Sequence, residues 1–93
     1  MRQENILNEL WSYFEEKPKE KWSKTDDKVH NFLNYDNLSS IILDGNVFWI
    51  EKTTSYTVIP NYIYRWIVKF YEKRGYMYLF KIKIKQTIEG EKF

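Results

Sequence analysis

Hydrophobic and polar positions follow two different periods on either side of Gly75. Across residues 60–74, apolar side chains recur at i, i+3, i+4 and i+7, which is typical of one buried helical face: Ile63, Trp66, Ile67 and Phe70. Across residues 76–88, apolar and polar side chains alternate as in a strand. Three lysines lie on the polar side: Lys81, Lys83 and Lys85. The pattern predicts an amphipathic helix that leads into a C-terminal strand, with its lysines facing water or a polyanion.

The N-terminal third of the chain is also helical in pattern. Residues 3–16 carry an apolar stripe, and Pro18 ends it because proline cannot continue a helix interior. A second, shorter helix is predicted for residues 26–34, with Ser23 or Thr25 as its N-cap. We therefore expect two helices before the first strand.

The middle of the chain reads as strands separated by turns. Residues 38–43 are predicted as a strand that enters a hairpin turn at Asp44-Gly45, although a short third helix is the alternative. Residues 47–52 and 56–59 are predicted as further strands. The predicted fold class is α+β, with N-terminal helices and an antiparallel sheet, built from the hairpin and the C-terminal strand, packed by the helix at 60–74.

The alternative for residues 38–43 changes the architecture. Three helices followed by a β-hairpin is the element order of a winged helix, which is a DNA-binding arrangement. A winged-helix-like fold is therefore the second prediction. In either case the 93 residues predict a single small domain over 1–93.

Charge and aromatic content are unevenly distributed along the chain. The net charge is +2, but residues 1–59 carry 7 Lys/Arg against 10 Asp/Glu, and residues 60–93 carry 8 against 3. Aromatic residues make up 19% of the chain, and nine of the 18 lie between Tyr56 and Phe80. A basic C-terminal half suits a polyanion, whereas abundant Tyr and Trp suit a protein interface.

Catalytic and metal-binding motifs are missing from the sequence. There is one histidine, His30, one turn after Asp26, and there is no cysteine. The three glycines are isolated, so no phosphate-binding loop is present. We expect no catalytic residues, no metal and no cofactor. Because no apolar run approaches a membrane span, we also expect a cytoplasmic protein without membrane contact.

The leading functional prediction is a small non-enzymatic protein that acts by protein–protein interaction. The composition, with Lys, Ile, Asn and Tyr in excess, resembles that of small viral or mobile-element proteins, many of which act by occupying the surface of a host protein. Tryptophan and tyrosine are frequent interface anchors, so the candidate protein-binding residues are Trp22, Tyr62 and Tyr76. For Trp22 itself, the first prediction is that it folds back as a lid on the core, and an exposed anchor is the alternative.

The second functional prediction is nucleic-acid binding through phosphate contacts by the basic C-terminal half. The candidate residues are a stripe on the predicted helix and the ladder on the predicted strand: Arg65, Lys69, Lys73, Lys81, Lys83 and Lys85. Neighbouring lysines in the ladder stand about 7 Å apart. The aromatic residues of the last strand lie on its other side, which weakens a base-stacking role. A homodimer formed through the C-terminal strand is a third prediction.

Overall fold

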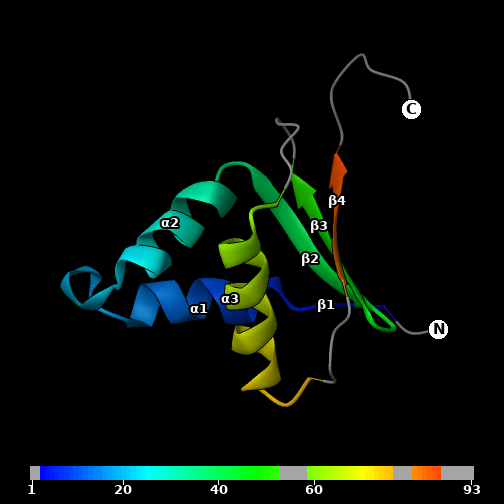
Figure 1. Ribbon diagram of the computed structural model, residues 1–93, viewed down its shortest axis with the longest axis horizontal. Coiled ribbons are helices and arrows are strands. Elements are labelled where there is room, and N and C mark those ends of the chain that lie inside the picture. The colour runs from blue at the N-terminus through cyan, green and yellow to red at the C-terminus, as the bar shows by residue number, and fades with distance from the viewer. Residues whose placement is uncertain (1–2, 53–58, 77–80, 87–93) are drawn as a thin grey trace.

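The computed structural model describes residues 3–52, 59–76 and 81–86 (Figure 1). These residues form three α-helices, one short 3-10 helix and four strands. In chain order the elements are β1 (Gln3–Asn5), α1 (Leu7–Glu16), η1 (Lys19–Lys21), α2 (Lys24–Leu33), β2 (Leu38–Asp44), β3 (Val47–Lys52), α3 (Asn61–Glu72) and β4 (Lys81–Gln86). The α+β fold class is thus confirmed.

The strands form one mixed sheet in the order β1-β2-β3-β4. β1 pairs with β2 and β2 pairs with β3 antiparallel, whereas β4 runs parallel to β3. The prediction that the C-terminal strand is antiparallel is therefore wrong. The reason is the intervening helix α3, because a helical crossover returns the chain to the starting end of the sheet and so makes the next strand parallel.

The N-terminal helix is shorter than the sequence pattern predicted. Residues 3–5 form the strand β1, which pairs with the end of β2, and α1 begins only at Leu7. Two hydrogen bonds hold this change of direction, from the Ile6 amide to the Ile41 carbonyl and from the Leu7 amide to Asn5 Oδ1. The pairing partners of β1 are 37 to 41 residues away, from Asn5 with Ile42 to Gln3 with Asp44. Such distant pairing does not show in local periodicity, so the helix prediction ran too far toward the N-terminus.

Local signals predicted the second helix and the hairpin correctly. Ser23 caps α2 in a capping box with Asp26, as one of the two proposed caps. Residues 38–43 lie in β2, so the winged-helix-like alternative, which required a helix there, is wrong. The hairpin loop is Gly45-Asn46, and the φ of 63° at Gly45 is the left-handed value that a two-residue hairpin favours at glycine.

The helix predicted at 60–74 is α3, with Pro60 as its N-cap and Gly75 just beyond its end at a φ of 90°. Its buried face joins residues of α1, α2, β2 and β3 in one core: Ile6, Leu10, Phe14, Val29, Leu33, Leu38, Ile41, Phe48, Ile50, Ile63, Ile67, Phe70 and Tyr71. Ile82 of β4 packs against this core. The predicted strand at 56–59 and the ends of the predicted strand at 76–88 lie largely outside the described residues.

The helices all lie on one side of the sheet (Figure 1). The core fills the space between this helical layer and the inner sheet face. No described helix or strand lies over the other face, which we call the open face. Within the described residues, one face of the four-stranded sheet therefore has no helical layer over it.

Candidate functional site

Strand β3 divides its side chains between the two faces of the sheet. Alternation places three of them under the helices, where they are buried: Phe48, Ile50 and Lys52. The other three are half-buried on the open face: Val47, Trp49 and Glu51. The open face thus has a tryptophan at the middle of its central strand pair.

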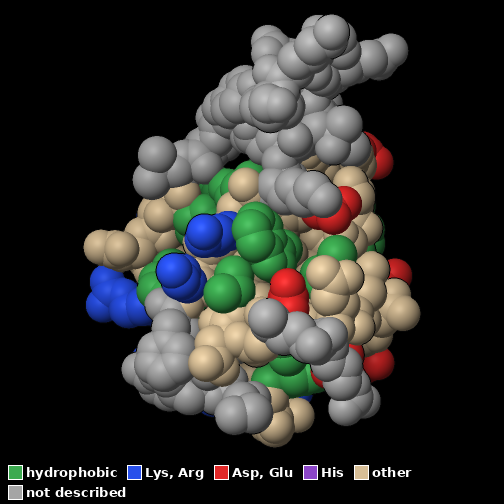
Figure 2. Space-filling model, turned by 90° about the vertical axis from the view of Figure 1, so that its right-hand side faces the viewer, with side chains coloured by type: hydrophobic (Ala, Val, Ile, Leu, Met, Phe, Trp, Pro, Cys, Tyr) green, Lys and Arg blue, Asp and Glu red, His purple; other side chains and the backbone are tan. Residues whose placement is uncertain are grey.

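The strand register sets the neighbours of each residue on the open face. One row across β2, β3 and β4 contains Asp44, Val47 and Lys81, and the next row contains Ile42, Trp49 and Lys83. Lys83 Nζ lies 5.5 Å from the centroid of the Trp49 ring, within the range of a cation–π contact. Figure 2 shows hydrophobic side chains at the centre of this face, with Lys/Arg toward one side and Asp/Glu toward the other.

A cleft of about 400 Å³ opens on this face. Its lining residues come from three strands: Gln3, Ile42, Asp44, Trp49 and Glu51. Asp44 Oδ1 is shielded from solvent and has no hydrogen-bond partner within the described part of the chain. The cleft thus combines an apolar floor with a carboxylate that retains acceptor capacity, which suits a ligand that brings its own donors.

The predicted basic residues fall on two separate surfaces. Lys81 and Lys83 are exposed on the open face, and the backbone of Lys85 continues the same register opposite Glu51. The three basic residues predicted on the helix are exposed on α3, in the layer on the other side of the sheet: Arg65, Lys69 and Lys73. The fold therefore does not bring all six basic residues together on one surface.

The three predicted protein-binding aromatics are scattered over the helical layer and its edge. Trp22 folds back on the core, which confirms the first of its two predictions: its Nε1 donates to the Lys17 carbonyl at 3.1 Å. Tyr62 is 42% exposed on the first turn of α3, whereas Tyr76 packs on Tyr71 at the end of this helix. Their role in binding stays a prediction, and only Tyr62 presents a largely exposed ring.

The comparisons with known proteins add no family to this geometry. Neither family models, nor curated proteins, nor solved structures gave a match to this chain. Within residues 3–52, 59–76 and 81–86, no group of three or more potential metal ligands comes together. None of the helices in that part of the chain has the length and apolar character to cross a membrane.

The helical layer is held by a buried carboxylate. Asp26 is 3% exposed and accepts hydrogen bonds from Tyr13, Lys17, the Ser23 amide and Trp66 Nε1 at 3.0–3.2 Å. Burial by itself raises the pKa of this carboxyl group, but the four donors outweigh burial, so the pKa of Asp26 is lowered. The ionised carboxylate of Asp26 therefore links α1, α2 and α3 through the four hydrogen bonds that it accepts.

His30 does not pair with Asp26, as its position one turn later had suggested. Its ring lies instead among four aromatic rings, those of Trp11, Phe14, Trp22 and Tyr35, with centroids 4.9–6.0 Å away. Burial lowers the pKa of His30, and the charge of Lys19 lowers it further. A neutral imidazole inside an aromatic cluster is a packing element of the helical layer.

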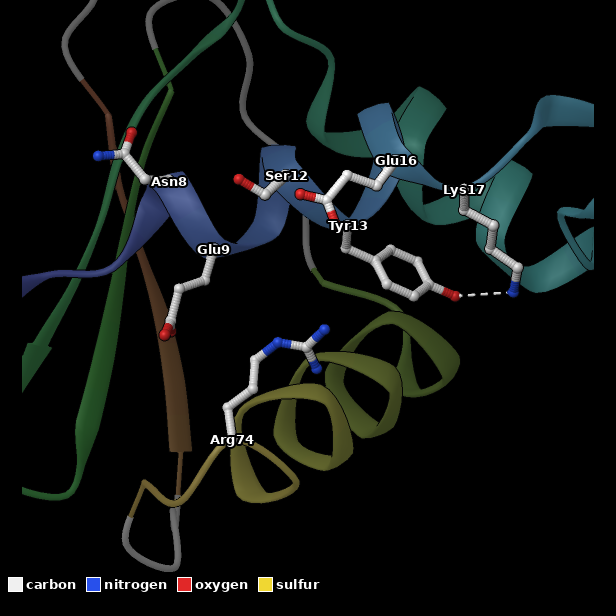
Figure 3. A pocket seen from close by; sticks show the side chains of 7 residues that line it. All are labelled: Asn8, Glu9, Ser12, Tyr13, Glu16, Lys17 and Arg74. Atoms are coloured by element: carbon white, nitrogen blue, oxygen red, sulfur yellow. Dashed lines mark hydrogen bonds between the residues drawn. The ribbon is translucent and has the colours of Figure 1, made fainter.

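A second cleft lies on the helical side, between α1 and the end of α3 (Figure 3). It measures about 530 Å³ and is lined mainly by one face of α1: Asn8, Glu9, Ser12, Tyr13, Glu16, Lys17 and Arg74. Figure 3 shows the Arg74 guanidinium reaching from α3 toward α1, and Tyr13 hydrogen-bonded to Lys17. The helical side thus carries its own polar site, separate from the open face.

Two functional features were missed by the sequence analysis. The first is Trp49, which lies in the predicted strand 47–52. Alternation along that strand could have assigned Trp49 to the face opposite Phe48 and Ile50. Its position beside Lys83 depends on the pairing of β3 with β4, which the local pattern does not contain. Asp26 was considered only as a neighbour of His30, because its partners from α1 and α3 are distant in sequence.

Proposed function

We propose that this protein is a non-catalytic binding domain that docks a protein partner on its open sheet face. The observation that carries the proposal is Trp49, half-buried at the centre of a face that no described helix covers. Trp49 is flanked by Ile42 and lies over a cleft of about 400 Å³. A central tryptophan surrounded by polar groups is the usual composition of an interface hot spot.

The charges of the open face favour a protein over a polyanion. Lys81 and Lys83 stand on β4, whereas Asp44 and Glu51 stand on β2 and β3. Carboxylates beside the tryptophan repel phosphates but complement a protein surface that offers both signs of charge. An inhibitory role, in which the domain occupies a functional surface of another protein, fits this mode of binding and belongs to the proposal.

The proposal is tested by affinity capture with three immobilised proteins: wild type, Trp49→Ala and Tyr62→Ala. Captured proteins are quantified by mass spectrometry from a lysate of the cells that produce this chain. We expect one partner with wild type and with Tyr62→Ala, and a loss of about tenfold or more with Trp49→Ala, since hot-spot truncation costs at least about 2 kcal/mol.

The two substitutions form a matched pair because each removes one aromatic ring from a different side of the molecule. Equal capture by Trp49→Ala and wild type would contradict the open face as the docking surface. Loss with Tyr62→Ala alone would instead support the aromatic site predicted on the helix. Circular dichroism of both variants establishes that they are folded.

Single-stranded nucleic acid is the second candidate ligand of the open face. The observation that favours it is the Lys83 Nζ position, 5.5 Å from the Trp49 ring centroid, next to the exposed Lys81. An aromatic ring for base stacking and cations for phosphates then lie within reach of one strand. This removes the objection that the aromatic residues of the last strand lie opposite its lysines.

Fluorescence anisotropy with a labelled single-stranded oligonucleotide at about 50 and 200 mM salt separates the two candidates. Nucleic-acid binding on the open face predicts affinity that falls steeply with salt and is lost in Lys81→Gln/Lys83→Gln. The matched control is Arg65→Gln/Lys69→Gln, which removes the same charge from α3. Absence of binding at the lower salt concentration, or equal loss in both double variants, would reject this candidate.

A further inference from the structure

A smaller cavity adjoins the cleft of Figure 3 and shares Tyr13 and Arg74 with it. It measures about 180 Å³, and its walls are aromatic and cationic: Tyr13, Trp66, Lys69, Phe70, Lys73 and Arg74. The cavity belongs to the helical layer and is independent of the open sheet face.

The cations of this cavity have no carboxylate beside them in the described part of the chain. Lys69, Lys73 and Arg74 line it together, and no described carboxylate does. Among the described residues, none of the three forms an ion pair, whereas the nearby Lys17 pairs with Asp26 at 3.2 Å. Lys69 and Lys73 are one helical turn apart, a spacing at which like charges destabilise a helix. A bound anion would relieve this repulsion.

Arg74 is already held in a binding orientation. Its guanidinium lies 3.5 Å from the centroid of the Phe70 ring, and its Nη1 donates to the Phe70 carbonyl at 3.1 Å. These contacts fix the plane of the guanidinium at the boundary that the larger cleft and the small cavity share, and they leave its remaining N–H groups for another acceptor. A planar, immobilised donor fork is well suited to a phosphate or carboxylate.

The negative end of the α3 dipole does not cancel the attraction of the three cations for an anion. A helix C-terminus carries the equivalent of about half a negative charge, which is much less than the charge of three cations. The acidic groups nearby, Glu9 and Glu16, line the larger cleft and not the small cavity. An anion is therefore favoured on the Lys69–Lys73 side of Arg74.

We propose that this cavity binds a phosphate monoester group. A dianion with three terminal oxygens can accept from the Arg74 fork and from both lysines at once, which a carboxylate with two oxygens cannot match. Trp66 stacks on Phe14 and on Phe70 at interplanar angles of 7° and 9°, so its ring is committed to packing. The recognised group is thus the phosphate itself, carried on a small molecule or on a phosphorylated side chain.

The test is a titration of the ¹⁵N-labelled full chain with sodium phosphate at pH 7.5, against sodium chloride at equal ionic strength. We expect saturable chemical-shift changes at the amides of residues 69–74 and at Arg74 Nε with phosphate only. Lys69→Gln/Lys73→Gln, two exposed positions that leave the fold intact, is expected to weaken binding about tenfold or more. Shifts equal to those in chloride, or unchanged affinity in this variant, would overturn the proposal.

Two further experiments separate specific recognition of phosphate from general attraction between charges, and they identify the molecule that carries the phosphate. Lys24→Gln/Lys28→Gln removes the same charge from two exposed positions one turn apart on α2 and is expected to bind phosphate as wild type does. Adenosine 5′-monophosphate and O-phosphoserine are titrated in parallel, with adenosine and serine as controls. Tighter binding of either phosphate compound supports the site and names the carrier, whereas equal binding of the unphosphorylated controls would overturn it.

Discussion

The two faces of the same sheet use similar residues in different ways. On the inner face the polar groups are satisfied within the fold: buried Lys52 donates to the Phe32 carbonyl, and Asp26, which lies above that face in the helical layer, has four donors. On the open face, one carboxylate oxygen of Asp44 has no hydrogen-bond partner among the described residues, and no described helix covers Trp49.

This difference in hydrogen bonding between the two faces separates residues that stabilise the fold from residues that are available for binding. Burying a polar group costs free energy unless it finds a hydrogen-bond partner, so the inner face retains polar groups only where partners exist. On the open face, Asp44 Oδ1 is shielded from solvent but has no hydrogen-bond partner among the described residues, so it keeps acceptor capacity for a partner molecule. The same substitution should therefore act on stability on one face and on binding on the other.

The largest loss of stability is expected from Trp66→Ala in the helical layer. Trp66 stacks on Phe14 and Phe70 and donates to Asp26 Oδ1 at 3.0 Å. Its removal leaves a cavity and an unused acceptor, which should lower the free energy of unfolding by about 3–5 kcal/mol. Urea denaturation measures this value. An unchanged midpoint would contradict the assignment of Trp66 to the core.

Asp26→Asn should have the next largest effect. The amide keeps the shape of the side chain but turns an NH₂ group toward donors, so part of the hydrogen bonding from Tyr13, Lys17 and the Ser23 amide is lost. We expect a loss of about 1–3 kcal/mol in urea denaturation. The exposed Asp36→Asn is the matched control and should stay within about 0.5 kcal/mol of wild type. Similar values for the two variants would argue against Asp26 as a structural centre.

The elements that the sequence predicted correctly are those with local signals. The capping box of Ser23 and Asp26, the period of α3 and the glycine at 45 all lie within a few residues of the structure they specify. The strand β1 and the direction of β4 depend on pairing between distant segments. The polar sequence Gln3–Asn5 has no strand pattern of its own, and it becomes a strand only because it meets the edge of β2.

The candidate sites show the same division. Alternation correctly separated Lys81 and Lys83 from the apolar side of β4, and Ile82 indeed packs against the core. The juxtaposition of Lys83 with Trp49 requires the parallel register of β3 and β4, and the cavity at Arg74 requires the packing of α3 on α1. Both are products of tertiary structure, so the sequence alone contained their residues but not their grouping.

A loss of stability of intermediate size is expected when the pH falls and His30 becomes protonated. Burial lowers its pKa in the folded state, Lys19 adds to this and Asp27 opposes it. As the pH falls below 6.5, the unfolded chain binds a proton before the folded one does, so stability should fall from there down to the folded pKa. Urea denaturation at pH 7.5 and 5.5 measures the loss. His30→Gln should flatten this dependence, and an equal slope in the variant would assign it to other groups.

The smallest change in stability is expected from Trp49→Ala, which makes the same truncation as Trp66→Ala on the opposite side of the sheet. Trp49 contacts Lys83 and its strand neighbours but fills no space in the core, so the loss should be about 0.5–1 kcal/mol, as for other cross-strand contacts. The same variant should nevertheless lose its partner in the capture experiment. A loss of stability as large as that of Trp66→Ala would show that Trp49 serves the fold, and it would remove the contrast between the two faces on which the proposed function rests.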